Sequence, residues 1–149
     1  MIESRSAFSA ARPYRDFDAL AAAARRAVRG RRAQREALND YIATLRIAVL
    51  VADDAGCYIG VNEEACRLTG HSRDELVALS VAELTAPEDA AAGERLWNSF
   101  VRSDYQRGSF TIRRKNGTPL RVVYHAYSDI ADGIHVSFLT AAGEDAPGS

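Results

Sequence analysis

The sequence predicts an α+β domain in which an antiparallel sheet is interrupted by short helices and preceded by a long helix. Three observations predict this class. Residues 16–45 combine strong helix formers with apolar side chains at a seven-residue spacing. Residues 47–61 hold two short apolar runs separated by turn residues, and residues 108–140 alternate around an Asn-Gly turn. The 149 residues have room for one such domain and an appendage.

The composition is that of a globular chain. Hydrophobic residues make up 47% of the sequence, charged residues 26%, and the net charge is −1, which argues against disorder. No apolar run approaches the roughly 20 residues needed to cross a bilayer, and the first residues lack the apolar segment of a signal peptide. We therefore expect a cytoplasmic protein without membrane contact.

Two cysteines, Cys57 and Cys66, are too few for a disulfide framework or a cysteine-rich zinc site. We expect both to be small core residues, and we expect no metal site.

The N-terminal part is predicted to be a leader followed by one helix. Pro13 and the lack of periodicity predict a mobile leader over residues 1–15. The helix is expected over residues 16–45, with Asp16 as its cap and Gly30 as the point where it would bend or break.

The apolar seam of this helix supports two interpretations, because it is interrupted by Arg31 and Gln34. The helix could pair with its own copy in a dimer, or it could fold back to cover a sheet. The dimer interpretation places the interface at Phe17, Leu20, Leu38, Tyr41, Ile42 and Leu45.

The same helix carries six arginines within eleven residues. They are Arg25, Arg26, Arg29, Arg31, Arg32 and Arg35. A contact with nucleic acid is conceivable, but Gln34 is the one amide side chain in this run that could contact bases, so a solvated helix face is the favoured interpretation.

The strands and helices of the domain follow in order. Residues 47–52 and 57–61 are short strands around an acidic turn, which predicts a hairpin. Asn62 is the predicted cap of a helix that Gly70 ends. Ser72 and Glu75 form the capping-box pattern of a second helix to about residue 79.

A third helix and three strands complete the domain. The helix is predicted from Pro87 to about Arg102. The strands are predicted over residues 108–115, 119–128 and 134–140, the first two joined at Asn116-Gly117.

The motifs resemble those of a PAS domain. Asn62 through Leu76 (NEEACRLTGHSRDEL) resembles the segment in which an Asn caps the first helix and a Gly and a Ser lead into a capped second helix. Pro87-Glu88-Asp89 resembles the start of the next helix, and residues 108–139 resemble the last three strands. The resemblance covers about residues 46–141 and implies a five-stranded antiparallel sheet with short helices and a pocket on one face.

The resemblance sets the expected limits of the PAS domain at residues 46–141. The residue patterns outside it predict a leader over residues 1–15, a helix over 16–45 and a disordered tail over 142–149. The strands are apolar on both faces, so the outer face of the sheet needs a cover. The nearest candidate is the stripe formed by Leu38, Tyr41, Ile42 and Leu45.

The expected pocket is apolar, with Trp97 and Tyr124 able to offer a polar group. Its predicted lining is Cys66, Leu68, Trp97, Phe100, Ile112, Tyr124, Val136 and Phe138. The sequence leaves two alternatives, a pocket that binds a small apolar metabolite and a filled core without a ligand.

Two histidines are expected to lie away from that pocket. His125 and His135 lie on adjacent strands, opposite in sense to Tyr124, Val136 and Phe138 if alternation is regular. We expect a structural pair that could face each other, not a metal site.

The cofactor is not identified by the sequence. The helix from Pro87 to Arg102 has no His to ligate haem, and residues 77–88 have no Cys for the flavin photochemistry of the light-sensing branch. The favoured expectation is no bound cofactor, with non-covalent flavin or haem as alternatives.

The expected function is that of a stand-alone sensory or protein-interaction module in signal transduction. We expect a homodimer with a downstream signalling protein as its partner. No catalytic constellation is present, so we expect no enzyme. The alternative is a DNA-associated regulator of transcription that uses the Arg-rich helix.

Overall fold

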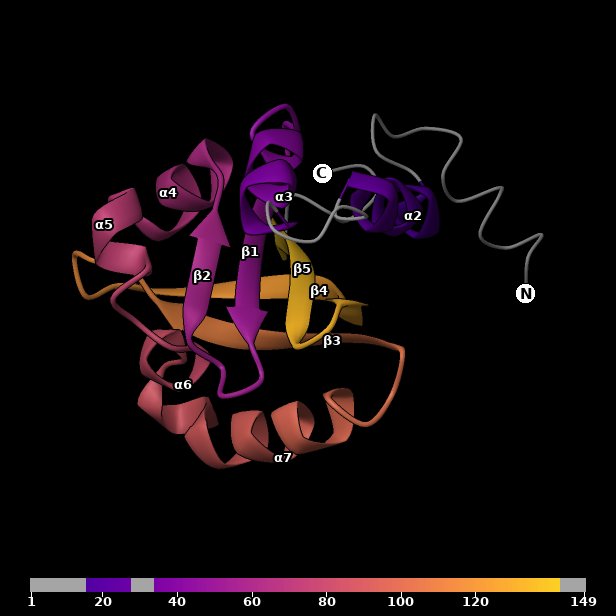
Figure 1. The fold of residues 1–149 in the computed structure, drawn as a ribbon. Helices are drawn as coiled ribbons and strands as arrows, with labels where there is room; N and C mark the ends of the chain where they lie inside the picture. The colour runs from indigo at the N-terminus through magenta and orange to yellow at the C-terminus, as the bar shows by residue number, and fades with distance from the viewer. Residues whose placement is uncertain (1–15, 28–33, 143–149) are drawn as a thin grey trace.

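The computed structural model describes residues 16–27 and 34–142 (Figure 1). The predicted leader, the bend at Gly30 and the tail from residue 143 lie outside the described residues. The N-terminal helices are α2 (Phe17–Ala27) and α3 (Gln34–Ile42). They are followed by β1 (Ala48–Asp53), β2 (Tyr58–Val61), α4 (Glu63–Thr69), α5 (Arg73–Leu76), α6 (Val81–Leu84), a 3₁₀ turn (Pro87–Asp89), α7 (Ala90–Phe100), β3 (Tyr105–Arg113), β4 (Pro119–Ala131) and β5 (Ile134–Ala141).

The five strands form one antiparallel sheet in the order β2-β1-β5-β4-β3. The last strand, β5, is therefore the central one, paired with β1 on one side and β4 on the other. This is the predicted fold class. The predicted strands are all present, although β3 begins earlier, at Tyr105, and β4 continues to Ala131.

The sheet separates two hydrophobic cores. On the inner face, α4 to α7 pack over the sheet through Ala65, Leu76, Leu84 and Phe100. On the outer face, α2 and α3 pack over it through buried side chains that include Leu38 and Ile42. Figure 1 shows α6 and α7 along one side of the sheet and α2 and α3 at the opposite side.

The predicted N-terminal helix is present as two helices, α2 and α3, which pack against each other. Their packing agrees with the second interpretation of the apolar seam, in which the N-terminal helix folds back to cover the sheet. The physical reason is that the outer face presents Val49 and Val51 on β1 and Val136 and Phe138 on β5, which are buried only if another element covers them. Gly60 on β2 allows the approach of α3, because a Cβ there would overlap the side chain of Asn39.

Asn62 joins the two layers at the end of β2. Its side chain is 1% exposed. The Oδ1 atom accepts hydrogen bonds from the backbone N–H groups of Val49 and Ala65, both at 3.0 Å. The Nδ2 atom donates to the carbonyls of Ile42 at 3.1 Å and Ile47 at 2.8 Å. The predicted helix cap is confirmed, and the same amide also fixes the end of α3 and the entry to β1.

Two capping boxes position the short helices. In the predicted one, Ser72 Oγ accepts from the Glu75 N–H at 3.1 Å and Glu75 Oε1 accepts from the Ser72 N–H at 2.8 Å. Lys115 donates to the same carboxylate at 2.7 Å, and these bonds lower the pKa of Glu75 to about 2. The second box, between Ser80 and Glu83, starts α6, which the sequence analysis missed although it has the same spacing.

Asn62 variants test the junction. Asn62→Asp keeps a good helix cap but places a carboxylate oxygen against two carbonyls, so we expect a loss of about 3 kcal/mol in unfolding free energy. Chemical denaturation measures this loss. Asn98→Ala, at an exposed position of α7, is the control and should change stability by less than about 0.5 kcal/mol. An Asn62→Asp protein as stable as the wild type would show that only the cap matters.

Candidate functional site

The inner face of the sheet and the helices α6 and α7 form the walls of an apolar cavity. The centre of a water molecule can reach a volume of about 80 Å³ inside it. Small residues leave this space open, namely Ala52, Ala126 and Ser137 on the sheet and Gly93 on α7. Because about 10–15 Å³ of such volume suffices for one water, the cavity has room for several waters or a small organic molecule.

Aromatic side chains form much of the cavity wall. Trp97 and Phe100 on α7 lie with their ring centroids 5.6 Å apart. Tyr124 enters from β4, and its hydroxyl donates to Gln106 Oε1 at 2.7 Å. Gln106 Nε2 in turn donates to the carbonyl of Leu96 at 3.2 Å, which ties β3 to α7. Burial raises the pKa of the Tyr124 hydroxyl.

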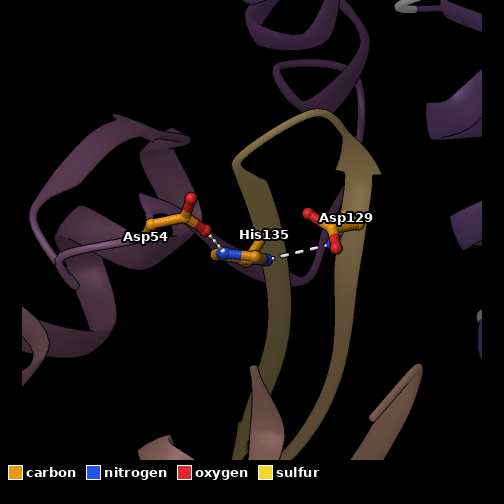
Figure 2. Close-up of side chains that lie close together, drawn as sticks. All are labelled: Asp54, Asp129 and His135. Atoms are coloured by element: carbon orange, nitrogen blue, oxygen red, sulfur yellow. Dashed lines mark hydrogen bonds and ion pairs between the residues drawn. The ribbon is translucent and has the colours of Figure 1, made fainter. Parts of the chain in front are cut away.

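His135 is the buried imidazole of the cavity, 3% exposed, and lies between Asp54 in the β1–β2 turn and Asp129 near the end of β4 (Figure 2). Its Nδ1 atom accepts a hydrogen bond from the backbone N–H of Asp129 at 3.0 Å. Since that amide can only donate, the neutral ring carries its proton on Nε2, which donates to Asp54 Oδ1 at 2.7 Å. The ring edges also contact Trp97 and Phe100, with centroids 5.8 Å and 5.6 Å apart.

Asp54, Asp129 and His135 bring three metal-type ligand atoms within 4.8 Å of one another. The hydrogen bonds of His135 argue against a metal here. Metal-bound histidines normally donate with the second ring nitrogen, whereas Nδ1 of His135 accepts. A metal on Nε2 would have to replace the one ring proton of the neutral imidazole, which would make the ring an anion. These three residues are better explained as a link between the β1–β2 turn and the adjoining ends of β4 and β5.

The predicted pocket residues divide between several places. Trp97, Phe100, Tyr124 and Val136 line the cavity. Ile112 is buried in the inner core, and Cys66 and Leu68 pack against that core without lining the cavity. Burial raises the pKa of the Cys66 thiol. Phe138 lies in the outer core, and Val136 belongs to the outer core although it borders the cavity.

The placement of Phe138 corrects the predicted alternation of β5. Tyr124 is paired with Leu139, and directly paired residues share a face of the sheet. The inner-face residues of β5 are therefore His135, Ser137 and Leu139. His135 lines the cavity instead of lying away from it, and it does not face His125, which is paired with Phe138.

The residues predicted for a dimer interface pack on the chain's own sheet. Leu38, Ile42 and Leu45 are buried in the outer core, and Phe17, Leu20 and Tyr41 are partly buried against it. A dimer through these side chains remains a prediction, and it requires α2 and α3 to leave the sheet.

Polar and aromatic contacts seat α2 on the sheet. Phe17 stacks on His125 with ring centroids 4.2 Å apart. The Tyr127 hydroxyl donates to Asp18 Oδ1 at 2.8 Å. Burial, with a smaller effect of the Asp18 carboxylate, raises the pKa of Tyr127.

The arginine cluster is described in part. Arg25, Arg26 and Arg35 are exposed, and Arg29, Arg31 and Arg32 lie outside the described residues. In the part of the chain that the structure describes, no helix is long and apolar enough to cross a membrane.

The sheet order, the layer of short helices and the apolar cavity define an α+β domain of the PAS type. The family model described as PAS fold matches residues 36–140. The chain therefore belongs to the PAS family. No curated protein matches its sequence.

Solved structures share this fold. A domain of a sensory box sensor histidine kinase/response regulator from Geobacter sulfurreducens is 24% identical, with a TM-score of 0.61 over 71% of this chain and 92% of that chain. A PAS domain of a LuxR-family transcriptional regulator from Burkholderia thailandensis, in complex with ethanol, is 15% identical. The TM-score is 0.58, over 70% of this chain and 96% of that chain. The Rhodobacter sphaeroides LOV protein is 12% identical, with a TM-score of 0.61 over 70% of this chain and 64% of that chain. At these identities the likeness shows the fold alone.

Two variants test the link through His135. His135→Leu removes the acceptor of the partly buried Asp129 N–H, so we expect it to lower the free energy of unfolding by about 1 kcal/mol. Asp54→Asn retains an acceptor oxygen at an exposed position and should cost less than about 0.5 kcal/mol. Urea denaturation measures both, and equal stability of His135→Leu and wild type would contradict the structural role.

Proposed function

We propose that this chain is a sensory and protein-interaction module of signal transduction, not a catalyst. In this proposal a small ligand in the inner-face cavity controls how firmly α2 and α3 lie on the outer face. One observation carries it, which is that the same strands form the cavity wall and the seat of the helices. On β4, for example, Ala126 lines the cavity while its neighbour Tyr127 bonds to Asp18 on α2.

The coupling follows from close packing. A protein interior has few voids, so a molecule that fills the cavity must be accommodated by its walls. On β5 the inner residues Ser137 and Leu139 alternate with Val136 and Phe138, which contact the helix layer. A ligand shifts the arrangement of the outer face to the extent that it binds one arrangement better than the other.

The output of the module is an apolar surface. Leu38 and Ile42 of α3 are almost fully buried in the outer core, so release of α3 would expose them together with the outer face of the sheet. Exposed apolar patches of this kind form protein contacts. The partner is a second copy of the chain or a downstream signalling protein.

The structural neighbours support a sensory function. One is part of a sensor histidine kinase/response regulator, and another is the PAS domain of a transcriptional regulator with ethanol bound. The cavity here matches a ligand of similar scale better than a large cofactor.

A reversible tether tests whether the helices pair with a second copy. Asn39 on α3 packs directly on Gly60 of β2, so a disulfide between Asn39→Cys and Gly60→Cys would hold α3 on the sheet. The native cysteines are replaced in the same chain by Cys57→Ser and Cys66→Ser. Light scattering should find a monomer for the oxidised protein and a dimer after reduction.

The control is the chain with Cys57→Ser and Cys66→Ser alone, which should be a dimer under both conditions. A dimer that persists in the oxidised, tethered protein would show that association does not need the release of α3. A control chain that is monomeric at all concentrations would contradict the homodimer.

A further inference from the structure

Tyr58 places a free hydroxyl at the cavity. It lies on β2, is 4% exposed and lines the cavity. Among the residues that the structure describes, its hydroxyl has no hydrogen-bond partner, and burial raises its pKa, so the group stays protonated and able to donate. Buried polar groups in folded proteins are nearly always paired. A molecule in the cavity would supply the missing partner.

Ser137 places a second hydroxyl on the same wall. It lies on the central strand and is paired with Leu50 on one side and Ala126 on the other, both buried. Ser137 is nevertheless only partly buried, and since strands flank it on both sides, its open side is the cavity that it lines. Its hydroxyl likewise has no partner within the described part of the chain.

Among the described residues, the other polar side chains of the lining are paired, except for the indole N–H of Trp97, which can only donate. Tyr124 bonds to Gln106, Thr85 Oγ1 donates to the carbonyl of Val81 at 2.8 Å, and both nitrogens of His135 are occupied. No side-chain nitrogen or oxygen that is completely enclosed lacks a partner in the described residues. The hydroxyls of Tyr58 and Ser137 therefore keep surface that a ligand can reach.

Within the described residues, the lining contains no Lys, Arg, Asp or Glu. An ion would enter an apolar space without an opposite charge, which is strongly unfavourable. The remaining lining is aliphatic and aromatic, including Leu50, Leu139 and Phe110. The ligand is therefore neutral, with an apolar body, and small enough for this cavity.

We propose that Tyr58 and Ser137 are the polar anchors of the cavity, and that its ligand is a small neutral molecule with an apolar body and one oxygen that accepts a hydrogen bond, such as a short ketone or alcohol. This inference rests on the proposed function, which assigns a ligand to the cavity. Tyr58 determines specificity because a ligand that fills the cavity displaces water from its hydroxyl, and only a ligand with an acceptor restores the hydrogen bond.

Two probes of the same shape test the anchors. Cyclopentanone carries an acceptor oxygen, and methylenecyclopentane replaces that oxygen with carbon. Dissociation constants are measured by ¹H–¹⁵N NMR titration of the full chain. Tyr58→Phe and Ser137→Ala should each weaken cyclopentanone binding by about three- to tenfold, as expected for one hydrogen bond. Binding of methylenecyclopentane should be unchanged or tighter.

A stability measurement separates the anchors from structural residues. Because the Tyr58 hydroxyl has no protein partner, Tyr58→Phe should have a melting temperature no lower than that of the wild type. Tyr124→Phe, which loses the bond to Gln106, should melt lower.

The outcomes distinguish the two proposals. If both probes bind the wild type but neither variant discriminates between them, the anchors are wrong and the ligand-binding function stands. If neither probe binds the wild type, the cavity takes no such ligand, and both the anchors and the ligand-controlled part of the proposed function are overturned.

Discussion

The four hydrogen bonds of the Asn62 side chain hold together segments that the rest of the structure depends on. One amide satisfies the end of α3, the entry to β1 and the first turn of α4. These backbone groups are buried where three segments meet, and only a side chain with two donors and an accepting oxygen pairs all of them. A hydroxyl or a carboxylate could cap α4 but could not also donate to two carbonyls. The helix cover and the inner-face helices are therefore positioned from one point.

The sheet that Asn62 anchors has unlike faces. Large side chains such as Phe138 of β5 and Ile42 of α3 fill the core on its outer face, which α2 and α3 cover. Its inner face carries Ala52, Ala126 and Ser137 at the centre, and the space they leave is the cavity. Both faces belong to the same strands, so the cavity and the helix cover share one wall. This arrangement gives a ligand a physical route to the outer surface.

Local signals made most of the fold predictable. Asn62, the Ser72–Glu75 box and Asn116-Gly117 each determine a cap or turn within a few residues, and the structure has all three. The face of each residue on β5 could not be obtained in this way. It depends on the pairing of Tyr124 with Leu139, which is a contact between strands. A pairing register that is wrong by one residue exchanges the two faces of β5, so the sequence placed Phe138 in the pocket and His135 outside it. The Ser80–Glu83 box is a local signal of the same kind, with the same spacing as the Ser72–Glu75 box.

The free hydroxyls could not be predicted from sequence at all, because a missing hydrogen bond is a property of the assembled core. Tyr58 and Tyr124 are both buried tyrosines, and only the folded structure shows that Gln106 reaches one of them. The same holds for α2 and α3, whose stripe fits a dimer seam as well as a sheet. What decides between them is the apolar area that β1 and β5 present.

The most direct test of the shared wall is a ¹H–¹⁵N NMR titration of the wild-type chain with cyclopentanone, read at the amides of the two outer helices, α2 and α3. Because α2 and α3 do not touch the cavity, their resonances should shift with the same dissociation constant as those of inner-face residues such as Ala126. Shifts confined to the inner face and α7 at saturation would contradict the account.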